Sequence, residues 1–564
     1  MVAEKIRKIK IKNFLLCLSL SIIGAILYAV SNPNPVIKKG FSVTAWFMYV
    51  PFLFLIKKSF LKSCWFYSGL YGALSVCLYA YWLYNYDSMC LLIAIPIAFI
   101  ATALLGLLLK SVEKIFFKNA WLVQFLIICT FDYLRSFGFL GIGYGLAAYT
   151  QWKFNSLIQI CSLIGVYGLN AFVILASAII FAFVSKSEDR MLLQKKLIND
   201  DKHYDGATYI NYVSENSKKL DYASLKIPCV VLCLWFIFFI FILIYGNIKL
   251  KKNQDYKTVT TVVVQHNDNP DENGLENFSD SVVRLMSLTD EALEINPDIR
   301  LVIWPENAFV PSVIYHYNQE QNSDRKQLVC YLLDYIQKHD VSFIIGNQQI
   351  EVNSSKSDRK IYTSSLLFDR SESVYPPHPE IYNKMKLVPF SEYFPYQKYF
   401  PNIYKAILQK QKFFNEPGNE IQIFKSEGLS VYTPICFENS FPSLCSKAYK
   451  KGARAFFCLV NDSWAKSESC QYEHLAMSKF RAVENNVPVS VSSVSGQTAF
   501  INQKGQIISM ANPFTKTYLI CEIPVLPETQ KPTIYNKIGD IFGYGMAILL
   551  LVVLIIRGLI AIIK

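Results

Sequence analysis

The chain has 564 residues, of which 52% are hydrophobic, 15% are aromatic and only 18% are charged. A composition this apolar excludes an ordinary soluble protein and predicts a membrane component. The formal net charge of +13 does not indicate a nucleic-acid-binding surface, because the lysines lie beside the apolar runs. We therefore expect no nucleic-acid partner.

Apolar windows of about 20 residues, the length that a helix needs to cross a bilayer, predict the membrane spans. They lie at 14–31, 64–84, 89–109, 121–145, 157–184, 228–247 and 541–561, and a shorter run at 45–56 is predicted as an eighth span. Residues 1–250 are thus expected to form a membrane domain with seven transmembrane helices, and residues 541–564 a C-terminal transmembrane helix. The first run also fits a cleaved signal peptide, but further spans follow at once, which favours an uncleaved helix.

Basic residues predict the orientation of these spans. With the N-terminus inside, the predicted cytoplasmic segments hold 19 Lys and Arg residues, eight of them in the loop at about 186–226, whereas the outward loops hold Lys38, Lys39 and Lys153. Positive residues are retained on the cytoplasmic side of bacterial membrane proteins. The long segment from about 250 to 540 is therefore predicted to lie outside the cytoplasm.

From Thr258 onward, short β-branched runs alternate with helical stretches, which is typical of an α/β layered domain. This domain is expected at 255–525, and a linker rich in Pro and Lys is expected at 526–540. The predicted strands are 258–264, 301–303, 341–345, 364–367, 429–433, 455–460, 487–493, 498–501 and 506–509, and the predicted helices are 277–294, 324–339, 440–451 and 470–485.

Two segments of this domain carry charged side chains next to apolar strands, where site residues of α/β domains usually lie. Glu306 ends the run Leu301-Val-Ile-Trp-Pro-Glu306, and partial burial there raises the pKa of a carboxyl toward that of a working base. Lys384 and Glu392 bracket an apolar Leu-Val-Pro-Phe stretch. Lys384 thus offers a fixed cation for a developing oxyanion and is expected to lower the pKa of a nearby thiol.

A third segment places Cys436 between the strand at 429–433 and a helix that begins near Asn439. Backbone N–H groups at such a turn can stabilise a thiolate or an oxyanion. Taken singly, these residues also fit structural roles: an exposed glutamate in a turn, a structural ion pair, or a buried cysteine that packs as a small hydrophobe. Their order and spacing are far more specific than any one of them.

Other common chemistries find no support in the sequence. The 14 cysteines and six histidines show no CxxC pair and no HExxH spacing, so we predict no metal site. The chain also lacks a GxSxG elbow and a Walker A loop.

Several motifs together resemble the apolipoprotein N-acyltransferases, in which a carbon-nitrogen hydrolase domain of the nitrilase superfamily is fused to a polytopic membrane domain. The resemblance covers nearly the whole chain and implies a multi-pass α-helical membrane domain plus a nitrilase-like α-β-β-α sandwich. Its motifs are WPE at 304–306, YxKxxLVPFxEYxP at 382–395, ICFE at 435–438, NDSW at 461–464, EHL at 473–475 with RAxE at 481–484, and GVYGL at 165–169.

The resemblance implies roles for individual residues. Glu306 is expected to be the general base, Lys384 the oxyanion-stabilising cation and Cys436 the nucleophile that carries the acyl group as a thioester. Glu392 and Glu438 match supporting carboxylates. Trp464, on an arm near the substrate entrance, and Asn461 are expected to contact substrate, and Phe437 stands beside the nucleophile.

The reaction implied is the transfer of an acyl chain from a membrane phospholipid, through the thioester, to the α-amino group of the diacylglyceryl-cysteine that begins an apolipoprotein. No cofactor is needed. We expect a monomer in the bacterial inner membrane with its catalytic domain on the periplasmic side.

The sequence also departs from the family pattern. Phe437 replaces a tyrosine and Ser391 a glycine, the segment 487–496 lacks two arginines and an Asn-Thr-Gly, and a tryptophan expected soon after Asn267 is absent. Two other functions stay open at this point. One is a membrane-anchored amidase of the nitrilase type, and the other is a transporter or receptor, against which the scarcity of intramembrane charge beyond Asp132 and Arg135 argues.

Overall fold

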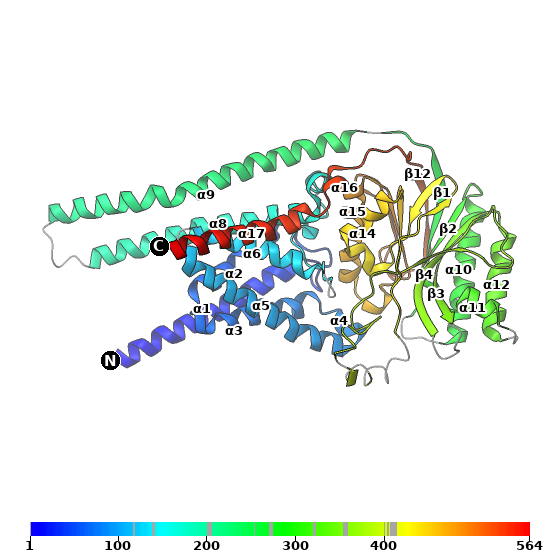
Figure 1. Cartoon of the computed structure of the whole chain (residues 1–564), viewed down its shortest axis with the longest axis horizontal. Coiled ribbons are helices and arrows are strands. Elements are labelled where there is room, and N and C mark those ends of the chain that lie inside the picture. Colours follow the sequence, from blue (N-terminus) through cyan, green and yellow to red (C-terminus); the bar gives the residue numbers. More distant parts are fainter. Residues whose placement is uncertain are drawn as a thin grey trace.

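The computed structural model consists of a long helical bundle joined to a two-sheet domain (Figure 1). It describes residues 2–116, 119–137, 141–199, 206–252, 254–269, 274–319, 323–352, 359–399, 401–402, 405 and 414–563. Both chain termini lie in the bundle, far from the sheets. The predicted fold class, a helical membrane domain plus an α/β sandwich, is confirmed.

Five of the described helices are long and apolar enough to cross a membrane. They coincide with the predicted windows 14–31, 89–109, 157–184, 228–247 and 541–561. These helices are α1 (Val2–Ser31), α5 (Ser88–Phe116), α8 (Cys161–Asn199), α9 (Gly206–Lys251) and α17 (Ile541–Ile563).

The other three predicted windows form shorter or less apolar helices packed among these five. They are α2 (Val50–Lys58), α3 (Leu61–Tyr79) and α6 (Ala120–Arg135), while η1 (Ser42–Trp46), α4 (Leu83–Tyr86), η3 (Tyr149–Gln151) and α7 (Asn155–Ile158) are short connecting turns. α3 packs on α1 and α5, and α6 packs on α5, α8 and α17. The window 121–145 is only partly helical, because α6 ends at Arg135 and the described residues 141–143 carry no regular structure. The count of eight spans stays a prediction.

The segment predicted as a loop at 186–226 is helical over its described residues 186–199 and 206–226, which extend α8 and α9 beyond their apolar parts. The sequence there lacks sustained periodicity, yet its described residues are helical, and the assignment of 186–226 as a cytoplasmic connection between two spans stays a prediction. Extending an existing helix is far easier than nucleating a new one, which explains why polar residues next to two apolar helices continue them.

The two-sheet domain is a sandwich of two six-stranded sheets. Their strand orders are β12-β1-β2-β3-β4-β5 and β11-β10-β9-β8-β7-β6. β1 and β2 face β8 and β9 across the interior, so the ends of β2 and β8 meet at one edge.

Helices cover the outer faces of both sheets. α10 (Leu275–Ile295) and α12 (Asp324–Lys338), with the short α11 (Val313–Tyr317), lie on the face away from the bundle (Figure 1). α14 (Pro442–Lys450) and α15 (Glu468–Asn485), with η4 (Cys436–Ser440) and η5 (Ser463–Ala465), lie between the second sheet and the bundle. The short α16 (Ile534–Ile538) falls within the predicted linker.

Most strands begin or end within a few residues of their predicted positions. They are β1 (Thr258–Gln265), β2 (Leu301–Phe309), β3 (Ser342–Val352), β4 (Arg359–Phe368), β7 (Leu429–Tyr432), β8 (Ala455–Val460), β9 (Val489–Ser493), β10 (Ala499–Ile501) and β11 (Ile507–Met510). The edge strands β5 (Glu380–Asn383), β6 (Phe424–Ser426) and β12 (Thr517–Pro524) were not predicted. Two of them are too short to show periodicity, and β12 is defined mainly by its antiparallel pairing with β1.

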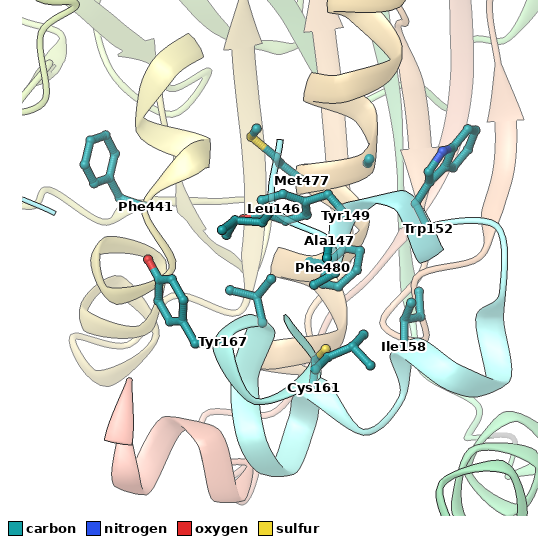
Figure 2. Close-up of a cluster of buried hydrophobic side chains, with 14 of the residues drawn as sticks. Leu146, Ala147, Tyr149, Trp152, Ile158, Cys161, Tyr167, Phe441, Met477 and Phe480 are labelled. Atoms are coloured by element: carbon teal, nitrogen blue, oxygen red, sulfur yellow. The ribbon is translucent and has the colours of Figure 1, made fainter. Parts of the chain in front are cut away.

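The two larger hydrophobic cores among the described residues follow from this layering. One lies between the first sheet and α10 and α12. The other runs without a break from the bundle through α14 and α15 into the sandwich interior. Figure 2 shows the junction within this second core, where Leu146, Tyr149 and Trp152 of the bundle lie beside Met477 and Phe480 of α15.

Candidate active site at the sheet edge

Cys436 occupies a sharp turn where the second sheet meets the bundle. It follows β7 and opens η4, and its φ of +50° lies in the left-handed region that residues with a side chain seldom adopt. The preceding residue, Ile435, forms an isolated parallel bridge with Leu459 of β8. The turn therefore holds the cysteine against the core in a strained backbone conformation, as is common for site residues.

Glu306 reaches the same edge from the first sheet because β2 becomes irregular after Trp304. The pairing of β2 with β3 shifts between Trp304 and Phe309, and Asn307 has a φ of +49°. On β3 the irregular strand lies against Gly346, where a Cβ atom would come within 2.0 Å of the Pro305 carbonyl oxygen. A glycine is therefore required where the two strands approach most closely.

Lys384 lies between two carboxylates in the buried site. Its Nζ is 3.0 Å from Oε1 of Glu306 and 2.7 Å from Oε1 of Glu392. The other oxygen of Glu392 accepts a hydrogen bond from the backbone N–H of Val388 at 2.8 Å. An ammonium has three N–H donors, and among the described residues two of them meet these carboxylates, so the third is available to a reacting oxygen.

Asn461, at the end of β8, contributes through its backbone. Its N–H donates to Oε2 of Glu306 at 2.9 Å, so both oxygens of Glu306 are held. The side-chain oxygen of Asn461 instead accepts hydrogen bonds from the backbone N–H and the hydroxyl of Ser463. The structure thus gives Asn461 a part in orienting Glu306.

Glu438 links the turn that holds Cys436 to the segment around Lys384 through hydrogen bonds. One of its oxygens accepts from the N–H of Ile435 at 2.9 Å, and the other accepts from the Tyr382 hydroxyl and the Met385 N–H, both at 2.7 Å. Its side chain is fully buried. Burial raises the pKa of Glu438 to about 7, although these donors oppose the shift.

The electrostatics of the site keep the thiol protonated at rest. Burial raises the pKa of Glu306, with Lys384 opposing the shift and a hydrogen bond with Cys436 also lowering it. Burial alone lowers the pKa of Lys384, but the two carboxylates raise it well above its usual range. Burial, reinforced by the charge of Glu306, raises the pKa of Cys436 well above that of a free thiol.

The expectation that Lys384 lowers the thiol pKa is therefore only half right. Lys384 does lower it, but burial and the Glu306 carboxylate outweigh that effect. The sequence could not show this balance, because it depends on how deeply the sulfur is buried. A charged lysine between two carboxylates is the resting arrangement, and the thiol must lose its proton as it reacts.

Two further residues singled out in the sequence are Phe437, which lies next to Cys436, and Trp464, which packs against the bundle. Phe437 is buried, stacks on Tyr144 with ring centroids 6.4 Å apart, and meets Phe441 edge-on at 5.1 Å. Trp464 of η5 packs edge-on against Trp82 and Tyr86 of the bundle, with centroids 5.6 and 5.2 Å apart. Trp464 therefore marks a contact between the catalytic domain and α4.

A second polar cluster beside Cys436 was not assigned from the sequence. Asp462 Oδ2 lies 2.9 Å from Nδ1 of His474, whose Nε2 hydrogen-bonds to the hydroxyl of Tyr144. Ligand atoms of Cys436, Asp462 and His474 lie within 4.8 Å of one another. These types of donor could hold a soft metal ion, but both ring nitrogens of His474 are already engaged, so the described side chains fit a hydrogen-bond network better.

Asp462 and His474 do lie within the NDSW and EHL motifs, which is the signal that could have identified them. Tyr144 lies some 300 residues earlier, between α6 and η3, and no pattern along the chain links it to them.

Comparison with known proteins bears on the whole chain. The carbon-nitrogen hydrolase family model matches residues 263–529, and the model for the apolipoprotein N-acyltransferase N-terminal domain matches residues 24–179. Apolipoprotein N-acyltransferase 1 of Treponema denticola is 34% identical, with 95% of each chain covered. The chain belongs to the apolipoprotein N-acyltransferase family. Apolipoprotein N-acyltransferase 1 of Treponema pallidum is 33% identical over 96% of this chain and 95% of its own, and apolipoprotein N-acyltransferase of Borreliella burgdorferi is 28% identical over 95% of both.

As a member of the apolipoprotein N-acyltransferase family, the chain combines both parts of the predicted architecture. The matched hydrolase region includes Glu306, Lys384 and Cys436, and the matched N-terminal region includes Tyr144. The site therefore lies where the two matched regions meet.

Proposed function

We propose that this protein transfers an acyl chain from a membrane phospholipid, through a thioester on Cys436, to the α-amino group of the N-terminal diacylglyceryl-cysteine of an apolipoprotein. The observation that carries the proposal is the buried arrangement of Glu306, Lys384 and Cys436, which meets the bundle through Phe437 and Tyr144. An acyl-transfer centre in contact with membrane helices suits two lipid substrates.

In the first half-reaction, the Cys436 thiol gives its proton to Glu306 as the sulfur attacks the ester carbonyl of the phospholipid. The free donor of Lys384 stabilises the oxyanion. The carbon–oxygen bond of the ester then breaks, Glu306 returns the proton to the departing alkoxide, and a lysophospholipid leaves. Lys384 and the Asn461 N–H hold Glu306 in position for both proton transfers.

In the second half-reaction, the neutral α-amine of the acceptor attacks the thioester carbonyl. Glu306 accepts a proton from the nitrogen, the carbon–sulfur bond breaks, and the proton returns to the sulfur. The products are an amide and the free thiol, so the cycle closes without a cofactor. The high pKa that burial imposes on Cys436 favours return of the proton to the thiol.

The competing function is a membrane-anchored amidase, in which water takes the place of the amine. Cys436 is only 7% exposed and the Glu306 side chain only 6%. Burial of this kind restricts access of bulk water to the thioester, which favours transfer over hydrolysis. Free fatty acid as the main product, with no acylated amine, would overturn the proposal.

The direct test is mass spectrometry of the purified full-length protein incubated with phospholipid. We expect an acyl adduct on Cys436 that hydroxylamine removes, no such adduct on Cys436→Ser, and little adduct on Glu306→Gln. Cys521→Ser is the matched control, because Cys521 is also buried but lies on β12. An adduct of normal abundance on Cys436→Ser contradicts the assignment. Undiminished activity of Cys436→Ala in cells supports a transporter or receptor instead.

We also propose that the catalytic domain faces the periplasm of a bacterial inner membrane, as the basic residues predict. A cysteine at Lys425, which is exposed on the catalytic domain, should react with an impermeant maleimide in spheroplasts. A cysteine at Arg7, exposed near the N-terminus of α1, should react only after lysis. The reverse pattern contradicts this orientation.

A monomer suffices for this chemistry. Glu306, Lys384 and Glu392 come from one chain and contact one another there, and the backbone N–H of Asn461 in the same chain holds Glu306. Light scattering of the detergent-solubilised enzyme should give the mass of one copy, and a stable dimer that dissociates with loss of activity contradicts this part of the proposal.

A further inference from the structure

A cavity of about 750 Å³ lies on the flank of the molecule, where the end of α9 meets the catalytic domain. Its wall combines the end of α9, the turn between β10 and β11, and the segment that leads to α16. The Nζ of Lys504 donates to the carbonyl oxygen of Leu250 at 2.7 Å, which links the turn to the helix end. None of the assigned catalytic residues lines this cavity. The helix α4, which contacts Trp464, lies on the opposite side of the bundle from α9 in Figure 1.

The cavity wall is strongly cationic. Among its described lining residues, Lys249, Lys252, Lys504 and Lys531 carry positive charge, and Asp255 is the one acidic side chain. Polar side chains and the aromatic ring of Tyr245 complete much of the wall. A cavity of this size and charge suits an organic anion more than it suits an apolar ligand.

Lys249 gives the strongest reason to expect a bound anion. Its ammonium nitrogen is buried and has no hydrogen-bond partner among the described residues. A buried charge without a partner is strongly unfavourable. The neighbouring lysines add to this cost through repulsion, and an anion bound among them would lower it.

The position of the cavity relative to the membrane indicates the source of the anion. Lys249 lies in the last turn of the candidate span Leu225–Lys251, where that span passes into the catalytic domain. The end of a membrane span lies at the level of the lipid headgroups. Phosphate groups are the abundant anions at that level.

We propose that this cavity binds the phosphate-bearing headgroup of a membrane lipid at a site separate from the acyl-transfer centre, with Lys249 as the principal ligand. The lipid holds α9 against the β10–β11 turn and the segment before α16, because all three contribute to the wall. It acts as a structural lipid and is not consumed. Acyl transfer at Cys436 therefore does not depend on it chemically.

The test measures thermal unfolding of the full-length enzyme in detergent, with a diether phosphatidylglycerol as the probe. A diether lipid has no ester to transfer, so Cys436 stays unmodified. We expect the probe to raise the Tm of the wild type by several degrees, and Lys249→Met to lose more than half of that rise. Without lipid, Lys249→Met should be at least as stable as the wild type, because the unpaired ammonium is gone.

Lys251→Met is the matched control. Lys251 lies two residues away at the same helix end, is exposed, and does not line the cavity. It should keep the full rise in Tm, whereas Lys531→Met, which changes an exposed cavity residue, should lose part of it. Lipid bound at the catalytic site affects all variants alike, so the difference between Lys249→Met and Lys251→Met isolates the cavity.

Two further probes separate the lipid from other anions. A diether glycerol without phosphate should give no difference between Lys249→Met and Lys251→Met. Inorganic phosphate alone should stabilise the wild type much less than the lipid does. An equal rise in Lys249→Met and the wild type, an equal loss in Lys251→Met, or a rise given by free phosphate and not by the lipid would each overturn the proposal. Thioester formation should stay within about twofold of the wild type in Lys249→Met, so a failure here is distinct from a failure of the catalytic assignment.

Discussion

The helical layers on the two outer faces of the sandwich differ in what they touch. α10 and α12 bury one face each against the first sheet and leave the other face open. α15 is buried along nearly its whole length, between the second sheet and the bundle. A covering helix can be amphipathic, whereas a helix enclosed on both sides buries its polar side chains and needs partners for them.

The buried polar groups of α15 make this difference concrete. Glu473 accepts from the Gly145 N–H and Glu484 from the Val166 N–H, both at 2.9 Å, so two carboxylates hold backbone turns of the bundle. Lys479 donates to the Trp152 carbonyl oxygen. α10 and α12 thus only cover the first sheet. α15 instead joins the second sheet to the bundle, and this junction brings Tyr144 to His474 beside Cys436.

The largest expected effect on acyl transfer is at Lys384, where the edges of the two sheets meet. Lys384→Met removes the proposed oxyanion donor and leaves Glu306 and Glu392 as neighbouring buried carboxylates, so acyl transfer should fall by about 10³-fold or more. The matched control is Lys386→Met, two residues along and exposed, which should retain nearly normal turnover. Comparable losses in both variants would show that the segment as a whole, and not the Lys384 ammonium, is needed.

The two layers should also differ in their tolerance of a lost charge. Arg481 on α15 pairs with Glu484 at 2.9 Å, and both are fully buried. Arg481→Met should destabilise the protein by about 3–5 kcal/mol, because it leaves a buried carboxylate without its cation. Arg325→Met on α12, where the side chain is exposed, should change stability by less than about 0.5 kcal/mol. Thermal unfolding of both variants measures the contrast, and equal shifts would contradict it.

Glu438 should make stability depend on pH. Its pKa is about 7 in the folded protein against an ordinary value of 4.5, so the folded state holds an extra proton between these values. The stability contributed by protonated Glu438 is full below about pH 4.5 and is lost as the pH rises through about 7. The loss is on the order of 3 kcal/mol. Unfolding from pH 4.5 to 8 should show this fall in the wild type and a smaller one in Glu438→Gln, and parallel curves would contradict the assignment.

The smallest expected effect on turnover tests the contact between the bundle and α15. Tyr144→Phe removes one hydroxyl that hydrogen-bonds to His474 and should lower turnover by about fivefold, equivalent to about 1 kcal/mol. Tyr84→Phe, an exposed tyrosine of α4, is the control and should have no effect. Turnover of Tyr144→Phe equal to that of Tyr84→Phe would show that the hydroxyl does not contribute.

The sequence by itself determined the two-part architecture and most of the strands, and it singled out Glu306, Lys384 and Cys436 as the candidate site. The lengths of the apolar runs, the periodicity of the strands and helices, and the order of Glu306, Lys384 and Cys436 can all be seen along the chain without knowledge of tertiary contacts. Only the tertiary structure decided that Tyr144 meets His474, that burial outweighs Lys384 at the thiol, and that the ammonium nitrogen of Lys249 is buried without a hydrogen-bond partner among the described residues. Each of these depends on contacts between segments far apart in sequence, and the energy of a charge or a hydrogen bond is set by the burial that those contacts produce.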